Sequence, residues 1–245
     1  MSNVSVITGG TSGIGRAIVL RIIEEAEPGD KIYINYGHSD EAAADLLDAL
    51  PRERRDMAEL IKADLSDYDA MYRFAETLRS RTDHVDWLVL NTGVGTYASF
   101  DDYTSELWDR VMRTNVSVPA LLVQQLKPLM AENGSIVFMG SHAGQMPYSR
   151  SVVYSVSKAA VMFLAKSLVK IFDEQRVRVN AIAPGFIETR WQKDRTAESC
   201  DRINRKIAAH RFGTPAEVAE LCYTLLTNEY LNGSIYDIHG GYDYF

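Results

Sequence analysis

Cysteine is scarce in this chain, and its scarcity excludes two ways of stabilising a protein. Cys200 and Cys222 are the only cysteines among 245 residues, and they lie far apart in the sequence. A disulfide framework requires several paired cysteines and a four-cysteine zinc site requires two close pairs, so the spacing supports neither. We therefore expect reduced thiols, as in a cytoplasmic protein.

The chain also lacks an excess of basic residues and a targeting segment. Lys and Arg total 26 against 33 Asp and Glu, which gives a formal net charge of -7. Nucleic acids bind clustered cations, so no nucleic-acid partner is expected. We find no apolar run of the roughly 18 residues that a membrane span needs, and no basic region with an apolar run after it at the start. The sequence predicts a cytoplasmic protein without a membrane partner.

The histidines do not follow a metal-binding pattern. The chain has five of them, and none stands at the close spacing from another ligand that metal motifs use. We therefore predict no metal site and interpret most of these side chains as structural or surface residues. His142 is the exception, because its position next to Ser141 could turn it toward a substrate.

Short β-branched runs recur along the chain, with helical patterns between most of them. The runs occupy residues 4–8, 31–36, 60–62, 87–90, 136–139, 177–182 and 235–238. This alternation is typical of βαβ units that share a parallel sheet. We find no linker or repeat, so residues 1–245 are expected to form a single domain. Residues 186–211 are charged and lack clear periodicity, and we interpret them as a substrate lid.

A glycine-rich turn follows the first run. In TGGTSGIG, residues 8–15, the glycines stand between a predicted strand and a predicted helix. Glycine permits a tight turn and close approach of a ligand, and a helix N-terminus attracts a pyrophosphate. A ligand-free connection would lose much conformational entropy to its glycines, so a dinucleotide site is favoured.

A second glycine pattern is interpreted as a decoy. Gly93, Gly95 and Ala98 match G-x-G-x-x-A, but they follow the fourth run instead of the first. No acidic residue closes a strand about 20 residues later, as the dinucleotide fingerprint requires.

A tyrosine and a lysine stand four positions apart in SVVYSVSKAAV, residues 151–161. Residues i and i+4 share one helix face, so Tyr154 and Lys158 would project into the same space. A tyrosine that exchanges protons near neutral pH needs its pKa lowered from ~10, and a neighbouring ammonium lowers it. Alone, the pair is better explained as a core tyrosine beside a snorkelling lysine, so the interpretation depends on the other motifs.

Several motifs in sequence order resemble the short-chain dehydrogenase/reductase family. They are TGGTSGIG at 8–15, ADL at 63–65, LNTG at 90–93, TNV at 114–116, FMGSHAG at 138–144, Tyr154 with Lys158, and APGFIET at 183–189. The resemblance covers essentially the whole chain. It implies a doubly wound α/β Rossmann domain whose seven-stranded parallel sheet has the order 3-2-1-4-5-6-7. It also implies hydride transfer between a nicotinamide cofactor and a ketone or secondary alcohol.

The same resemblance implies four catalytic residues. Tyr154 would be the general acid or base, and Ser141 would hydrogen-bond the reacting oxygen. Asn115 would hold a water that links Lys158 to solvent, and Lys158 would also contact the nicotinamide ribose.

The binding residues follow from the remaining motifs and from the end of the second run. The expected cofactor contacts are Thr8, Gly9, Thr11, Ser12, Gly13, Ile14, Gly15, Asn35, Tyr36, His38, Ser39, Asp64, Leu65, Asn91, Thr92, Gly93, Tyr154, Lys158, Pro184, Gly185, Ile187 and Thr189. The expected substrate contacts are His142, Phe186 and Trp191.

The end of the second run, INYGHSD, favours NADP(H) over NAD(H). An acidic residue closing that strand would bind the ribose 2′-hydroxyl and repel a 2′-phosphate, but Tyr36 occupies the place. No arginine stands in this turn, and Ser12 fills a position that is often basic in NADP-specific relatives. Asp40 and Glu41 are interpreted as first-turn helix residues. Donors for a phosphate come from Asn35, His38 and Ser39.

The substrate stays open at this level. INYGHSDEAA, HRFGTPAEVAEL and NGSIYDIHGGY resemble the 3-oxoacyl-[acyl-carrier-protein] reductases, which would make the substrate an acyl thioester. Leu90, Thr92 and Gly140 depart from the usual family residues, so another small ketone, sugar or alcohol is equally open. A dinucleotide-sensing regulator without activity is the alternative from another class, although such proteins usually lack the tyrosine or lysine. An epimerase or dehydratase of the extended branch would need a further domain.

The run VMFLAKSLVKIF, residues 161–172, is apolar on more than one stripe of a helix. A second apolar stripe indicates a second buried face. Together with the habit of the family, it predicts a homotetramer or a homodimer.

Overall fold

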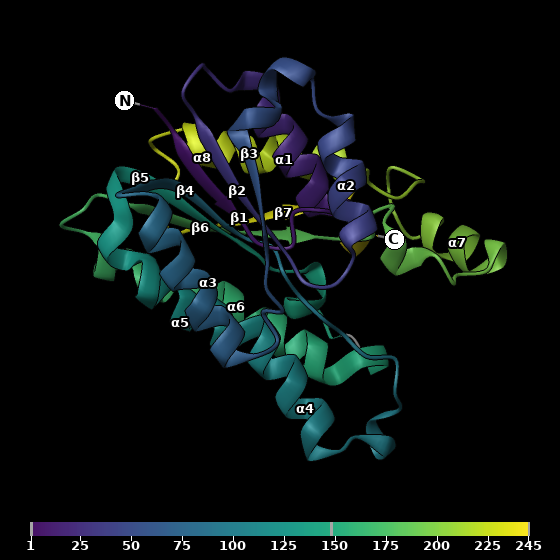
Figure 1. Ribbon diagram of the computed structural model, residues 1–245. Coiled ribbons are helices and arrows are strands. Elements are labelled where there is room, and N and C mark those ends of the chain that lie inside the picture. The colour runs from purple at the N-terminus through teal and green to yellow at the C-terminus, as the bar shows by residue number, and fades with distance from the viewer. Residues whose placement is uncertain (1, 148, 245) are drawn as a thin grey trace.

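The computed structural model describes residues 2–147 and 149–244. Seven parallel strands form one sheet in the order β3-β2-β1-β4-β5-β6-β7 (Figure 1), which confirms the predicted topology. The strands are β1 (Val4–Ile7), β2 (Lys31–Tyr36), β3 (Ala58–Lys62), β4 (Val85–Leu90), β5 (Met130–Met139), β6 (Arg178–Pro184) and β7 (Ile235–Ile238).

Helices cover both faces of this sheet (Figure 1). The α-helices are α1 (Gly13–Glu25), α2 (Asp40–Ala49), α3 (Tyr68–Arg81), α4 (Ser105–Met112), α5 (Val118–Leu126), α6 (Val152–Leu168), α7 (Ala197–Asn204) and α8 (Pro215–Thr227). One apolar core joins the sheet to α3, α5 and α6, and another joins it to α1, α2 and α8. Because both faces are covered, the central strands are rich in apolar residues, and all seven residues of β6 are buried, including Arg178 and Asn180.

Local capping fixes where two of the helices begin. Thr214 accepts the backbone N–H of Glu217, and the Glu217 carboxylate accepts the N–H of Thr214 at 2.7 Å, so α8 opens with a capping box. Ser39 caps α2, and Asp40 and Glu41 stand in its first turn as the sequence predicts.

Helix α6 is the longest of the described helices, and it continues into a 3-10 turn, Val169–Phe172, that carries Ile171. Residues 152–172 are long and apolar enough to cross a membrane by length and composition, so the expectation that no run reaches this length is wrong here. The core helix of a globular protein meets the same criterion. Here α6 packs on β5 and β6 through Val161, Met162 and Ala165, while Phe163 is 71% and Ile171 is 55% exposed. The helix therefore has a covered face and an exposed apolar face.

All seven strands point the same way, so their carboxyl ends meet at one edge of the sheet. The glycine turn follows β1, Asn91 follows β4, and Ser141 stands two residues after β5. Pro184 ends β6, and the predicted lid, residues 186–211, begins two residues later. Open parallel sheets bind ligands at this edge, next to the point where the strand order reverses.

Candidate active site

The turn between β1 and α1 forms a cradle that side chains would fill. Gly9 and Gly13 have φ angles of 60° and 52°, in the left-handed region that favours glycine. A Cβ atom on Gly15 would collide with the carbonyl oxygen of Gly9. The N-terminus of α1 follows directly, with Ser12 in an extended conformation at the cap. These residues fit a pyrophosphate, because the backbone is open to close approach and the helix dipole favours an anion.

Three buried or half-buried side chains support this cradle from behind. The Oγ1 atom of Thr8 accepts the N–H groups of Asn91 and Thr92 at 2.9 and 3.1 Å. The amide of Asn91 donates to the carbonyls of Thr8 and Gly9 at 3.2 and 3.1 Å. Asn35 is 1% exposed, accepts the N–H of Gly9 at 3.3 Å and donates to carbonyls at the end of β3. The Oδ1 atom of Asn35 thus bonds the glycine turn, and its Nδ2 atom bonds the end of β3.

The ends of β2 and β3 meet in a small polar network. The hydroxyl of Tyr36 donates to Asp40 at 2.9 Å, and the Nζ atom of Lys62 lies 2.7 Å from the same carboxylate. The two strands pair in register with Tyr36 opposite Lys62. Sequence reasoning missed this cation, although Lys62 closes a predicted strand and neighbouring parallel strands end together. The ammonium of Lys62 holds the pKa of the Asp40 carboxyl below its ordinary value.

Asp64 follows β3 at the same edge. Burial pushes the pKa of its carboxyl upward, but the hydrogen bond from the Ser66 N–H at 2.9 Å and the nearby His38 imidazole outweigh it and lower the pKa. His38 lies 3.5 Å from Asp64 and is highly exposed. Leu65 is buried beside them, whereas Ser39 uses its hydroxyl to cap α2. The predicted adenosine contacts therefore gather at one corner of the sheet edge.

Tyr154 and Lys158 lie on one face of α6, as their spacing predicts. The Nζ atom of Lys158 is 5.7 Å from the centre of the Tyr154 ring. Lys158 is only 4% exposed, and its ammonium donates to the carbonyl of Met139 at 2.7 Å. Burial lowers the pKa of Lys158 to about 8. A Cβ atom on Gly93 would lie 3.2 Å from this ammonium, so glycine keeps the approach to it open.

Asn115 joins the loop after β4 to α6. Its side-chain amide accepts the N–H of Val94 and donates to the Val94 carbonyl, both at 2.8 Å. It also donates to the hydroxyl of Ser157 at 2.9 Å, and Ser157 donates in turn to the Tyr154 carbonyl at 2.7 Å. The Oδ1 atom of Asn115 and the Nζ atom of Lys158 both face the space beside Gly93.

The backbone around Asn115 is a π-helical turn, residues 113–117, inserted between α4 and α5. In an α-helix the carbonyl of Asn115 would accept the N–H of residue 119, but Pro119 has no N–H. The N–H of Val118 instead reaches back five residues to Arg113. The proline was the available signal for this turn, and sequence reasoning overlooked it.

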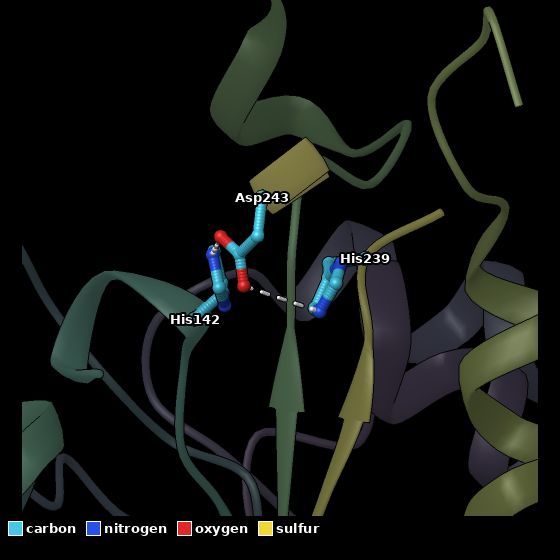
Figure 2. A group of neighbouring side chains, drawn as sticks. All are labelled: His142, His239 and Asp243. Carbon is cyan, nitrogen blue, oxygen red and sulfur yellow. Dashed lines mark hydrogen bonds and ion pairs between the residues drawn. The ribbon is translucent and has the colours of Figure 1, made fainter. Parts of the chain in front are cut away.

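Ser141 follows β5 in an extended conformation, and its hydroxyl accepts the N–H of Ala143 at 3.2 Å. The next residue, His142, is 7% exposed and lies in a cluster with His239 and Asp243 (Figure 2). Its Nε2 atom is 2.7 Å from Asp243, and the two imidazole rings are 4.4 Å apart. His142 therefore contacts the C-terminal segment.

The cluster in Figure 2 has metal-binding residue types, with one atom from each residue within 4.8 Å of the others. The backbone N–H of Tyr242 donates to Nδ1 of His239 at 3.2 Å, which places the ring proton on Nε2, 3.8 Å from Asp243. Two imidazoles thus direct their N–H groups at one carboxylate. His239 and Asp243 are four positions apart, but sequence spacing could not reveal the cluster, because the fold brings His142 to them from 97 positions before His239.

The segment after β6 lies against the glycine turn. The side chain of Thr189 is 3.3 Å from the position of a Cβ atom on Gly13, and an open cavity of about 620 Å³ is lined by both residues. Ile187 is buried and bridges to Gly213, while Gly185 packs closely on His239.

The two predicted aromatic lid residues have different surroundings. Phe186 stacks on Phe212 at 5.7 Å and touches Tyr242, in a small core of the segment that contains α7. Trp191 instead lies with its ring 5.7 Å from that of Tyr154. Trp191 is thus close to Tyr154, whereas Phe186 packs with Phe212 and Tyr242.

Similarity to known proteins agrees with this geometry. The short chain dehydrogenase family model matches residues 3–199. The 3-oxoacyl-[acyl-carrier-protein] reductase of Aquifex aeolicus is 30% identical, covering 97% of this chain and 96% of the relative. The trihydroxynaphthalene reductase of Colletotrichum orbiculare is 28% identical, covering 98% and 89%. A Pseudomonas aeruginosa structure, the RhlG/NADP active-site complex, superimposes with a TM-score of 0.85 at 28% identity, covering 98% and 96%.

The family model spans most of the chain, and the fold, the glycine cradle and the tyrosine–lysine helix agree with it. The protein therefore belongs to the short-chain dehydrogenase/reductase family and is an oxidoreductase that acts on CH–OH or C=O groups with a nicotinamide cofactor.

Proposed function

We propose that the protein interconverts a small-molecule ketone and a secondary alcohol, with NADP(H) as the preferred cofactor. The observation that supports this most strongly is the convergence of Lys158 and Asn115 beside Gly93, with the ring of Tyr154 5.7 Å from the same ammonium. A general acid, a buried cation and a polar amide then surround one point at the carboxyl edge of the sheet. This is the set of groups that reduction of a carbonyl requires.

Each residue in this proposal has a stated task. The cofactor supplies or accepts the hydride when bound. Tyr154 donates its phenolic proton to the oxygen of the reduced ketone, or removes that proton in the reverse direction. Lys158, whose pKa is about 8, is mostly protonated at pH 7, and its charge favours the phenolate. Ser141 holds the reacting oxygen by a hydrogen bond, and Asn115 holds a water that connects Lys158 to solvent.

The preference for NADP(H) is supported by the end of β2. Tyr36 stands where an acidic residue would repel a 2′-phosphate. Lys62 adds a cation directly opposite Tyr36, and the exposed imidazole of His38 lies at the same corner. The Pseudomonas aeruginosa neighbour is an NADP complex, which agrees with this choice.

The substrate class is drawn from two relatives with different substrates. Similarity to the 3-oxoacyl-[acyl-carrier-protein] reductase of Aquifex aeolicus supports an acyl thioester, and similarity to the trihydroxynaphthalene reductase supports an aromatic substrate. We further propose a cytoplasmic single-domain protein in which residues 186–211 form a lid. The exposed apolar face of α6 supports a homodimer or homotetramer, because Phe163 and Ile171 would be covered by a second copy.

The experiment that tests this function mixes the purified protein with NADPH or NADH and follows absorbance on addition of acetoacetyl thioesters, aryl ketones and simple ketones. Oxidation of NADPH that depends on one carbonyl supports the proposal. Tight NADPH binding without turnover of any carbonyl would favour the regulator that binds a dinucleotide without catalysis. No binding of either nucleotide would contradict both.

A further inference from the structure

We infer that Trp191, Gly95 and Tyr154 form an aromatic clamp that selects ketones carrying a flat apolar group, such as an aryl ring, next to the reacting carbonyl. The inference rests on the proposed function, since it assumes that the reacting carbonyl binds at Tyr154. It narrows the substrate class and gives Gly95, a residue of the decoy pattern, a physical role.

Trp191 approaches the proposed proton donor from the segment after β6. It stands in a short 3-10 turn, residues 190–192, whose N-cap hydroxyl is that of Thr189. Its ring centre lies 5.7 Å from that of Tyr154 at an angle of 44° between the planes. The indole is still 46% exposed. A partly exposed indole beside the ring of the proposed proton donor is a surface that a substrate can cover.

Gly95 leaves the room that the indole occupies. A Cβ atom at this position would lie 2.8 Å from Cζ2 of Trp191 and 3.3 Å from Cδ2 of Tyr154. Gly95 does not have a positive φ angle, so its backbone conformation does not demand glycine. The demand is for space, because the two rings meet over this residue.

Tyr97, in the same loop as Gly95, holds the segment that carries Trp191. The hydroxyl of Tyr97 donates to the backbone carbonyl of Trp191 at 3.3 Å, and Tyr97 is 64% exposed. The loop after β4 and the segment after β6 are therefore joined at the place where Trp191 turns toward Tyr154.

Beside the rings of Trp191 and Tyr154, binding of an aromatic substrate is favoured and binding of a polar substrate is disfavoured. An aromatic pair gains from tilted or offset contact in addition to the apolar area it buries. The hydroxyl groups of a sugar, by contrast, would lose water against the carbon face of the indole without gaining partners. Since about 1.4 kcal/mol is a factor of ten, one such contact is expected to change selectivity by roughly tenfold.

The test compares kcat/KM for 2-tetralone, an aryl ketone, with that for 2-butanone in the wild type and in W191A, W191F and G95A. The ratio between the two ketones should fall about tenfold in W191A and in G95A and be largely kept in W191F. The double variant W191A/G95A should lose no more selectivity than W191A alone, because the added methyl of G95A acts through the indole. Thermal unfolding and NADPH titration establish that each variant is folded.

Four outcomes would overturn the inference, the last of them together with the proposed function. Equal losses for the two ketones in W191A would show that the indole is structural only. Additive losses in the double variant would show that Gly95 acts independently of Trp191. Wild-type turnover of a sugar in preference to both ketones would contradict the substrate class while leaving the proposed function intact. Absence of any carbonyl turnover, with NADPH bound, would instead overturn the proposed function and the inference with it.

Discussion

The ammonium of Lys158 lies 5.7 Å from the ring of Tyr154 and 2.7 Å from the carbonyl of Met139, at 4% exposure. This placement costs stability, because burial disfavours the charged form of the lysine and lowers its pKa to about 8. Lys158, which the proposed chemistry needs, thus lowers the stability of the fold, and such residues are common at active sites.

Lys158→Met should therefore stabilise the protein at pH 7 and abolish turnover. Below pH 8 the folded state must hold a buried charge, whereas the unfolded lysine keeps its ordinary pKa of 10.5. Between pH 8 and 10.5 the unfolded state binds more protons, so wild-type stability rises with pH. Allowing for the lost hydrogen bond to Met139, we expect the free energy of unfolding of Lys158→Met to exceed that of the wild type by about 2 kcal/mol at pH 7. This difference should disappear by pH 10.5.

Urea unfolding of both proteins across this pH range measures the difference. Lys166→Met, a change on the same helix, is the matched control and should show no such pH dependence. A wild type more stable than Lys158→Met at pH 7 would contradict the account of the buried charge.

Lys62→Ala should weaken NADPH binding about tenfold or more and change NADH binding little. The ammonium of Lys62 pairs with Asp40 at 2.7 Å at the end of β3, and the proposal assigns to it a charge-assisted hydrogen bond with the 2′-phosphate that NADH lacks. Fluorescence titration of both nucleotides gives the two dissociation constants. Lys31→Ala, at the opposite end of β2, is the control. If binding of both nucleotides weakened equally, Lys62 would not determine the preference for NADPH.

Asp243→Asn should loosen the C-terminal segment, because a neutral amide oxygen accepts from His142 Nε2, now 2.7 Å from the carboxylate, more weakly than a charged oxygen does. A hydrogen bond to a charged group contributes about 1.5–3 kcal/mol, and partial exposure of Asp243 puts the expected loss near 1 kcal/mol. Thermal unfolding measures it, with Asp237→Asn in the exposed part of β7 as the control. Unfolding temperatures that match in the two variants would show that the cluster does not hold this segment.

Phe163→Glu should shift the protein toward the monomer. Phe163 is 71% exposed on the apolar face of α6, and a charge there cannot be buried against a second copy. Light scattering after size exclusion measures the mass, with Tyr230→Glu as the control, since Tyr230 is 96% exposed and follows α8. A wild type that is already a monomer at micromolar concentration would contradict the predicted assembly.

The sheet and the cradle could be read from the sequence because both depend on local patterns. Each β-branched run lies inside a strand or extends one residue beyond it. The order of the strands followed from the resemblance to the family. The spacing of Tyr154 and Lys158 placed them on one face, since a helix period decides that.

Other features depend on contacts between distant segments and could not be read in this way. The sequence pattern predicts Asn35 as a phosphate donor, but it could not show that its Nδ2 donates to Ala63 and its Oδ1 accepts the N–H of Gly9. The approach of Trp191 to Gly95, and of His142 to Asp243, comes from loops that meet only in the folded chain. Pro119 could have revealed the π-helical turn at Asn115, because a missing N–H leaves a mark in the sequence.

The central claim is that Tyr154 transfers the proton, and Tyr154→Phe tests it most directly. The variant keeps the ring and removes only the hydroxyl. Single-turnover reduction of a carbonyl that the wild type accepts, with NADPH already bound, should slow by at least about 100-fold, while the dissociation constant for NADPH stays within about twofold. A variant that binds NADPH normally and reduces the carbonyl at the wild-type rate would contradict the mechanism.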